Sequence, residues 1–190
     1  MGPSISTRVT SARLVLRPPR TADVAELRLR LRQNSTHLRP WSPSPPPGDD
    51  PTSLTAVSKS LVRYRREWKR GEAYVLLVTK RVLGEPIVGR LSLGGIMRGV
   101  FQNAYLGYWI DHEHQGQGLM TEAVQAGIDF AFREARLHRV QAAVMPRNPA
   151  SVRVLEKAGF RHEGLAQRYL CIAGIWEDHL IFARTADDPA

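Results

Sequence analysis

The clearest periodic pattern lies at residues 53–70, where apolar side chains recur at steps of three and four residues. Leu54, Leu61, Tyr64 and Trp68 fall on one face of this segment, while arginines and lysines occupy the other faces. This spacing predicts an amphipathic helix that packs its apolar face on a core. We interpret Trp68 and Tyr64 as core residues because they continue the apolar stripe.

Shorter apolar runs on both sides of this helix predict the remaining elements. We expect strands at 12–18, 73–79, 86–96, 104–110, 139–145, 161–170 and 175–183, and further helices at 22–34, 118–133 and 150–158. Thr21 is the expected N-cap of the first helix, and Gly159 is expected to end the last one. Gly94 and Gly95 are expected to bend the strand that contains them.

The order of these elements indicates an α/β fold. Three consecutive strands imply antiparallel pairing in the middle of the chain, and strand–helix–strand units imply parallel pairing in its second half. The sequence therefore predicts a single domain over 1–190, with a core at about 10–185, in which helices flank a central mixed sheet. Residues 40–51 hold six prolines in twelve positions, so we expect an irregular surface loop there.

The composition excludes several protein classes. The single cysteine, Cys171, excludes an intramolecular disulfide, and we interpret it as a small core residue of a cytoplasmic protein. No run of 18 apolar residues is present, and the N-terminus lacks the apolar stretch of a signal peptide, so we expect neither a membrane span nor export. The six histidines show no ligand spacing, and we therefore predict no metal site.

The charge is distributed unevenly. Residues 1–72 contain 14 Lys and Arg against 6 Asp and Glu, whereas the remaining residues contain 13 against 12, so nearly all of the net +9 lies in the N-terminal part. Such a surface would attract a polyanion such as RNA or the phosphates of CoA. However, most of the basic residues are arginine, as a GC-rich genome would encode, and a solvated face is the alternative interpretation.

The segment Gln115–Thr121 is the strongest candidate for a binding site, because it follows a predicted strand and opens a predicted helix. Gly116 and Gly118 allow a tight turn that exposes consecutive N–H groups, and the helix N-terminus adds a partial positive charge. The pattern predicts a phosphate or pyrophosphate site. It lacks the third glycine of the dinucleotide fingerprint and the Gly-Lys-Ser/Thr of the P-loop, and a tight turn without a ligand is the alternative.

Four motifs in order carry a family resemblance. They are Tyr108-Trp109-Ile110, Gln115-x-x-Gly118-x-Met120, the segment Asn148-Pro149-x-Ser151 to Gly159-Phe160, and Trp176-x-Asp178-His179. Together they resemble the GNAT superfamily of N-acetyltransferases, and within it the RimJ/RimL branch, over about residues 10–185. The second motif departs from the superfamily pattern in having Met120 where a glycine or alanine is usual.

The resemblance implies a GNAT fold with a mostly antiparallel sheet, in which the strands at 104–110 and 139–145 splay apart. It also implies acetyl-CoA as co-substrate. The residues that would bind it are Trp109, Ile110, Gln115, Gly116, Gln117, Gly118, Leu119, Met120, Thr121, Asn148 and Ser151. The backbone amides of 115–121 would hold the pyrophosphate, and Asn148 the pantetheine arm.

Two of these residues are implied to be catalytic. The Ile110 amide would polarise the thioester carbonyl, and Ser151 would stabilise the departing thiolate. Many members of the superfamily have a tyrosine acid seven residues after the position of Asn148, and this chain has Leu155 there. A serine at the start of a helix is often only a cap, which is the alternative interpretation of Ser151.

No side chain offers a convincing covalent nucleophile, so we expect direct attack by the amine in a ternary complex. The general base is undefined, with His112, Glu113, Asp178 and His179 as candidates. Trp41, which precedes the proline-rich loop, either lines the acceptor groove or packs under that loop.

The resemblance favours acetyl transfer to the N-terminal α-amine of a protein, with ribosomal proteins as the family precedent. The alternative is a small-molecule amine such as an antibiotic or metabolite, or transfer of another acyl group. A non-catalytic acyl-CoA-binding or RNA-associated module is a weaker alternative, because no RNA-binding motif is present. Ribosome association is a further prediction, and whether the chain is a monomer or a homodimer stays open.

Overall fold

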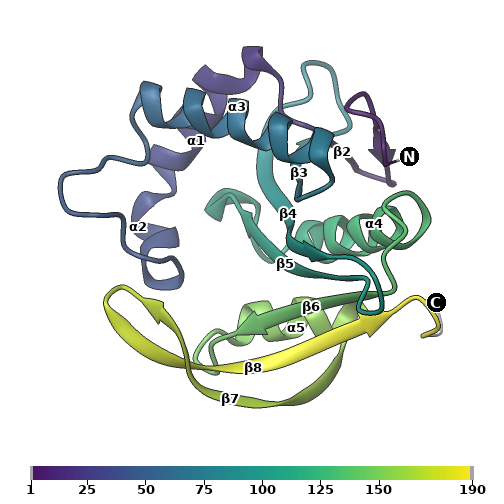
Figure 1. Cartoon of the computed structure of the whole chain (residues 1–190). Coiled ribbons are helices and arrows are strands. Elements are labelled where there is room, and N and C mark those ends of the chain that lie inside the picture. The colour runs from purple at the N-terminus through teal and green to yellow at the C-terminus, as the bar shows by residue number, and fades with distance from the viewer. Residues whose placement is uncertain (1, 189–190) are drawn as a thin grey trace.

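The computed structural model describes residues 2–188, which form one eight-stranded sheet with helices on both faces (Figure 1). The strands lie in the order β1-β2-β3-β4-β5-β6-β8-β7. Their bounds are β1 Val9–Thr10, β2 Leu14–Arg17, β3 Tyr74–Lys80, β4 Ile87–Met97, β5 Asn103–Ile110, β6 Arg139–Val144, β7 Arg161–Ile172 and β8 Ile175–Thr185. The helices are α1 Val24–Gln33, α2 Ser35–Leu38, α3 Leu54–Arg70, α4 Leu119–Arg133 and α5 Pro149–Lys157, with 3-10 turns η1 Thr21–Asp23, η2 Arg39–Trp41 and η3 His112–His114.

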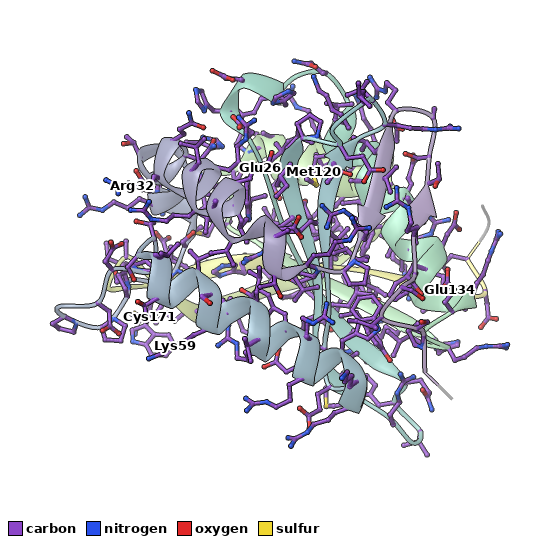
Figure 2. All side chains as sticks on the ribbon, turned by 90° about the horizontal axis from the view of Figure 1, so that it is seen from above. Glu26, Arg32, Lys59, Met120, Glu134 and Cys171 are labelled. Carbon is purple, nitrogen blue, oxygen red and sulfur yellow. The ribbon has the colours of Figure 1, made fainter. Side chains whose placement is uncertain are left out.

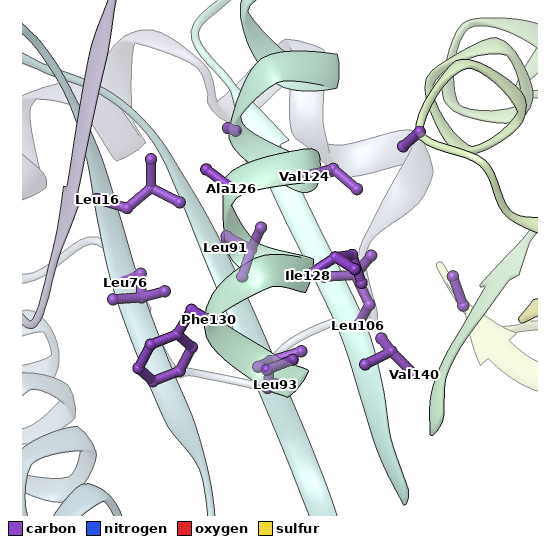
Figure 3. Close-up of a cluster of buried hydrophobic side chains, with 14 of the residues drawn as sticks. Leu16, Leu76, Leu91, Leu93, Leu106, Val124, Ala126, Ile128, Phe130 and Val140 are labelled. Atoms are coloured by element: carbon purple, nitrogen blue, oxygen red, sulfur yellow. The ribbon is translucent and has the colours of Figure 1, made fainter. Parts of the chain in front are cut away.

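Alternation along the strands separates two apolar clusters. On one face of the sheet, α4 packs against β2, β4 and β6, and its Ile128 and Phe130 meet Leu76, Leu91 and Leu106 (Figure 3). On the other face, α1 and α3 cover a smaller cluster, whose members are Leu27, Val57, Leu61, Leu77, Ile87 and Trp109. This arrangement confirms the expected α/β fold with helices flanking the sheet.

The sheet consists of two halves that are joined weakly. Strands β2 to β5 pair in antiparallel order, whereas β5 pairs with β6 in parallel at only three positions, from Asn103↔Arg139 to Tyr105↔Gln141. Strand β6 pairs along all six of its residues with β8. Beyond Tyr105, β5 and β6 therefore diverge, which confirms the splay that the resemblance implies.

The expected parallel pairing of the second half holds only for β5 and β6. Strands β6 and β7 flank α5 in the sequence, but β8 lies between them and pairs antiparallel with both. The hairpin formed by β7 and β8 is long, and its turn has positive φ at both Ala173 and Gly174. This tight hairpin carries β8 back beside β6, which a strand–helix–strand pattern cannot reveal.

The direction of the β5 peptide groups follows from one hydrogen bond. The N–H of Asp111 donates to the carbonyl of Val88 on β4 at 2.8 Å. Because N–H groups alternate in direction along a strand, the peptide groups of Leu106, Tyr108 and Ile110 point away from β4. Those of Tyr108 and Ile110 lie beyond the last pair with β6 and therefore face the gap between β5 and β6.

Most of the local predictions are confirmed. Helix α3 begins after Ser53, whose side chain accepts the N–H of Ala56, and it ends at Gly71 in the left-handed conformation. The β4–β5 register shifts between Gly94 and Met97, as expected for a bend there. Gly159 follows the end of α5 with a φ of 79°.

Three local predictions were wrong, and one strand was missed. Strand β1 was not expected, and Thr21 lies inside the η1 turn instead of capping α1. The expected loop at 40–51 begins inside η2, because a proline is accommodated at the start of a helical turn. Cys171 is exposed on β7 and is not a core residue.

A buried ion pair fixes the start of α1. Arg17 on β2 donates two hydrogen bonds of 2.8 Å to the carboxylate of Asp23, which also accepts the N–H of Arg20. Both side chains are less than a tenth exposed. Burial disfavours the ionised form of Asp23, but these hydrogen bonds outweigh it and hold the pKa of Asp23 below its usual value.

Replacement of Asp23 by Asn should lower the free energy of unfolding at pH 7 by about 3 kcal/mol, because the buried Arg17 charge loses its two-bonded partner. Only Glu85, 3.6 Å from Arg17 Nε, then remains as a partner carboxylate. A depressed folded-state pKa gives stability that is present above the unfolded pKa of about 3.9 and is lost as the pH falls through the folded value. Denaturant unfolding should therefore show the two proteins converging below about pH 4. The control is Asp129→Asn, whose pair with Arg133 is exposed. A difference that stayed constant into acid would contradict a charge effect.

Candidate functional site

The loop between β5 and α4 has the geometry of an anion site. Gly116 and Gly118 have φ angles of 69° and 72°, which favour glycine. Gly118 is the N-cap of α4 and supplies no side chain to the first N–H groups of the helix. Those N–H groups are therefore available to an external acceptor, and the helix dipole favours an anion there. An added Cβ at Gly116 would meet nothing within 4 Å, so the space over the loop is open.

A brace from β2 supports this loop. Arg13 donates to the carbonyl of Gln117 at 2.9 Å and to the carboxylate of Glu122, in the first turn of α4, at 2.7 Å. Glu122 also accepts the N–H of Arg13 and the hydroxyl of Ser11. The loop is therefore held from outside through its carbonyl, and its N–H groups are not used for this purpose.

The gap between β5 and β6 contains a cavity of about 490 Å³. Its walls come from both faces of the sheet. Tyr108 and Ser151 lie on the α5 side, and Trp41 and Pro43 lie on the side of α2 and η2. The further lining residues are Tyr105, Leu106, Gly107, Ala142, Ala143, Val144, Met145, Asn148, Tyr169, Leu170, Ile172 and His179. A passage through the sheet at this point lets two reactants approach each other from opposite faces.

Ser151 lies at the α5 side of the cavity and is not the helix cap. Asn148 is the N-cap of α5, because its side-chain oxygen accepts the N–H of Ser151 at 3.1 Å. The Ser151 hydroxyl instead meets the hydroxyl of Tyr108 at 2.8 Å. The interpretation of Ser151 as a helix cap is therefore wrong. Its hydroxyl contacts Tyr108, and both residues line the cavity.

A second set of contacts borders the opposite side of the cavity. The Arg147 guanidinium lies 5.1 Å from the centre of the Trp41 ring and pairs with Glu177 on β8 at 2.7 Å. It also donates to the carbonyl of Pro40 at 3.3 Å. Through Arg147, these contacts attach η2 to β8. Trp41 is thereby held in place as a lining residue of the cavity.

Of the four candidate bases, His179 lines the cavity. It is almost fully buried, and its Nδ1 lies 2.9 Å from the carbonyl of Glu177, which can only accept. In the neutral ring, Nδ1 therefore holds the proton and Nε2 the lone pair. His112, Glu113 and Asp178 do not line the cavity, and the Asp178 carboxylate accepts the N–H of Arg168.

The other residues expected to bind the co-substrate fall into two groups. Gln115, Gly116, Gln117 and Gly118 are exposed on the loop, and Thr121 is half-buried behind it. The side chains of Trp109, Leu119 and Met120 are buried in the core, so these residues offer only backbone groups (Figure 2, which labels Met120). The Ile110 peptide group faces the gap.

These features fit a molecule with an anionic end and an extended arm. The uncapped N–H groups of α4 suit a pyrophosphate, and the unpaired peptide groups of β5 suit a chain that binds like an added strand. Among residues 2–188, no group of three or more His, Cys, Asp and Glu side chains is placed to hold a metal ion. Within the same range, no helix is long and apolar enough to cross a membrane.

Comparison with protein families decides the assignment. The acetyltransferase (GNAT) domain matches residues 13–161. The chain belongs to the GNAT acetyltransferase family.

Two relatives place this GNAT protein more closely. The [ribosomal protein uS5]-alanine N-acetyltransferase of Escherichia coli (strain K12) is 34% identical over 182 residues, 95% of this chain and 92% of the relative. The structure of Mycobacterium smegmatis RimJ with CoA-disulfide superposes with a TM-score of 0.90 at 33% identity, covering 98% of this chain and 91% of that one.

A third relative agrees with them. RimL, a ribosomal L7/L12 alpha-N-protein acetyltransferase solved with coenzyme A, gives a TM-score of 0.84 at 26% identity, covering 96% and 100% of the two chains. The predicted resemblance to RimJ and RimL is therefore confirmed. The GNAT protein is an acetyltransferase, and acetyl-CoA is its co-substrate.

Sequence reasoning missed three side chains of this GNAT site. They are Arg13 at the loop, Tyr108 opposite Ser151, and Arg147 over Trp41. Tyr108 was visible as part of a motif, but nothing local indicated its partner. Arg13 and Arg147 were indistinguishable from the many other arginines of the chain.

Proposed function

We propose that this GNAT enzyme acetylates the N-terminal α-amine of a protein, with a ribosomal protein as the substrate class. The supporting observation is the cavity that passes through the sheet, with Ser151 on one side and Trp41 and Pro43 on the other. A flexible peptide end can enter from the side of Trp41, opposite to α5. The relatives that act on ribosomal proteins support the same class.

Each part of the site has a role in this proposal. The N–H groups at the start of α4 bind the pyrophosphate, and the β5 peptide groups that face the gap bind the pantetheine arm. Asn148 lines the cavity beside that arm. The Ile110 amide donates to the thioester carbonyl. Bound acetyl-CoA supplies the acetyl group and a thiolate leaving group, and Ser151 donates a hydrogen bond to that sulfur.

We assign proton removal from the acceptor amine to Nε2 of His179. An α-amine has a pKa near 8, so about a quarter of it is neutral at pH 7.5, against about one part in a thousand for a lysine amine of pKa near 10.4. One weak base is therefore sufficient for an α-amine.

The basic N-terminal part gives less support to ribosome association than its net charge suggests. Arg8, Arg13 and Arg30 pair with Glu85, Glu122 and Asp111, which all belong to the second part of the chain. These contacts neutralise part of the excess charge locally. Ribosome association and homodimer formation stay predictions, and a ribosomal acceptor would place the enzyme in the cytoplasm.

Replacement of Gly118 by Asp should weaken CoA binding at least tenfold, because it puts a negative charge beside the phosphates. An added Cβ would have Arg13 Nη2 as its nearest neighbour at 3.6 Å, so there is space for a side chain, although the positive φ strains any substitution here. Gly118→Asn is the matched control, since it has the same size, no charge, and tolerates a positive φ. Calorimetry with CoA should rank Asn above Asp. Equal affinities of the two variants for CoA would show that the phosphates do not bind at this loop.

The acceptor class is tested by acetyl-CoA consumption with three sets of amines. Peptides that begin with Ala or Ser should be acetylated on the α-amine, as located by mass spectrometry. The same peptides with a blocked N-terminus and an internal lysine should be inactive. Polyamines and aminoglycosides form the third set, and faster turnover of any of these than of every peptide would overturn the proposal in favour of a small-molecule acceptor.

Replacement of His179 by Asn keeps a donor for the Glu177 carbonyl and removes the basic nitrogen. We expect kcat/KM to fall about 10- to 100-fold at pH 6.5–7, and the loss to shrink near pH 8, where the amine deprotonates unaided. The control is His112→Asn, outside the cavity. A pH-independent loss in His179→Asn would indicate a structural role for His179.

A further inference from the structure

The hydroxyl of Tyr108 bridges the two halves of the sheet. It lies 2.8 Å from Ser151 Oγ and 3.2 Å from the Ser151 carbonyl oxygen, so β5 and α5 meet across the gap. Both side chains line the cavity. Burial raises the pKa of Tyr108 to about 12, although the hydrogen bond with Ser151 acts in the opposite direction. The phenol is therefore protonated throughout the neutral range.

Two arrangements of the hydroxyl protons fit these distances. In one, Tyr108 donates to the Ser151 carbonyl and accepts the Ser151 hydroxyl proton. In the other, Tyr108 donates to Ser151 Oγ, and the Ser151 proton is free to point into the cavity. The exchange requires only rotation of two hydroxyl groups, with no movement of heavy atoms.

We infer that Tyr108 is a positioning residue, which donates to Ser151 Oγ and so directs the Ser151 proton to the sulfur of the co-substrate. The inference rests on the proposed function of Ser151. In the step concerned, the amine nitrogen forms a bond to the acetyl carbon, the carbon–sulfur bond breaks, and its electron pair goes to sulfur. The proton released by the amine passes to the base, and the thiolate accepts the hydrogen bond of Ser151.

The pair acts by donating hydrogen bonds and not by transferring the Tyr108 proton. A thiol has a pKa near 8.5, well below that of the half-buried phenol, so transfer of the proton from Tyr108 to the thiolate is unfavourable. The thiol proton therefore comes from the released amine proton or from water. A donor with such a high pKa has the advantage that it remains a donor at every working pH.

Without Tyr108, the Ser151 hydroxyl would have another partner available. Serines in helices readily donate to the carbonyl three or four residues earlier, which would turn the proton away from the cavity. Leu155, at the position of the usual tyrosine acid, is completely buried in the core and offers no hydroxyl. In this chain the tyrosine that reaches the sulfur site comes from β5 instead of α5.

The test uses the affinity of CoA relative to desulfo-CoA, measured by calorimetry from pH 6.5 to 9.5. If the site stabilises the thiolate, the affinity for CoA should rise about tenfold with pH, while that for desulfo-CoA should not. Tyr105, Tyr169, His179 and the Arg147–Glu177 pair also lie in or beside the cavity. Their titration affects both ligands and cancels in the ratio.

The variants separate positioning from packing. Tyr108→Phe and Ser151→Ala should both lose the pH-dependent gain, and the double variant should be no worse than Ser151→Ala, because Tyr108 acts through Ser151. Ser151→Thr, which keeps the hydroxyl, should retain the gain. Tyr74→Phe is the matched control, a buried tyrosine of the main core. In steady-state assays Tyr108→Phe should lower kcat about tenfold with little change in the KM for acetyl-CoA.

If the rise of CoA affinity with pH survives in Tyr108→Phe but not in Ser151→Ala, the inference about Tyr108 is overturned and the role of Ser151 stays intact. Normal CoA binding without any gain in the wild type would overturn both roles while leaving acetyl transfer in place. Absence of CoA binding would overturn the proposed function itself.

Discussion

Three residue pairs join β5 to β6, and the functional site depends on the loss of pairing beyond them. Peptide groups that lie inside a protein need hydrogen-bond partners, so an unpaired strand edge beside a cavity is stable only with water or a ligand along it. Beyond Tyr105, β6 diverges from β5 and stays with β8, with which it pairs along all six of its residues. The edge of β5 therefore remains available to an extended ligand.

Two sets of side-chain contacts reconnect the halves of the sheet that the backbone leaves apart. Tyr108 meets Ser151 on one face, and Arg147 joins Trp41 to Glu177 on the other. Helix α4 also packs against strands of both halves. The gap thus has fixed walls, which is what a reaction between two bound molecules requires, since most of its rate comes from holding them in place.

Features that depend on a few neighbouring residues were predictable from the sequence. The apolar stripe of α3 and the two glycines before α4 determine their structure through neighbouring residues alone. The predicted helix and the predicted tight turn are both present. The insertion of β8 between β6 and β7 was not predictable, because it depends on which of the two later strands pairs more favourably with β6. The contact of Tyr108 with Ser151 was equally hidden, since 43 residues separate the partners. Cys171 was misplaced because the long β7 lies at the edge of the sheet, where most of its residues are exposed.

The tripeptide Tyr108-Trp109-Ile110 shows how a short motif serves several purposes through strand geometry alone. Side chains alternate between the two faces, so Tyr108 points to α5 while Trp109 enters the cluster under α1 and α3. Peptide groups alternate within the plane of the sheet, so the amide of Ile110 faces the gap. Trp109 therefore contributes by anchoring β5, and its neighbours can then present a hydroxyl and an amide in fixed directions. A shift of one residue in the β4–β5 register would exchange these directions, which explains why a large buried side chain lies between the two residues assigned to the chemistry.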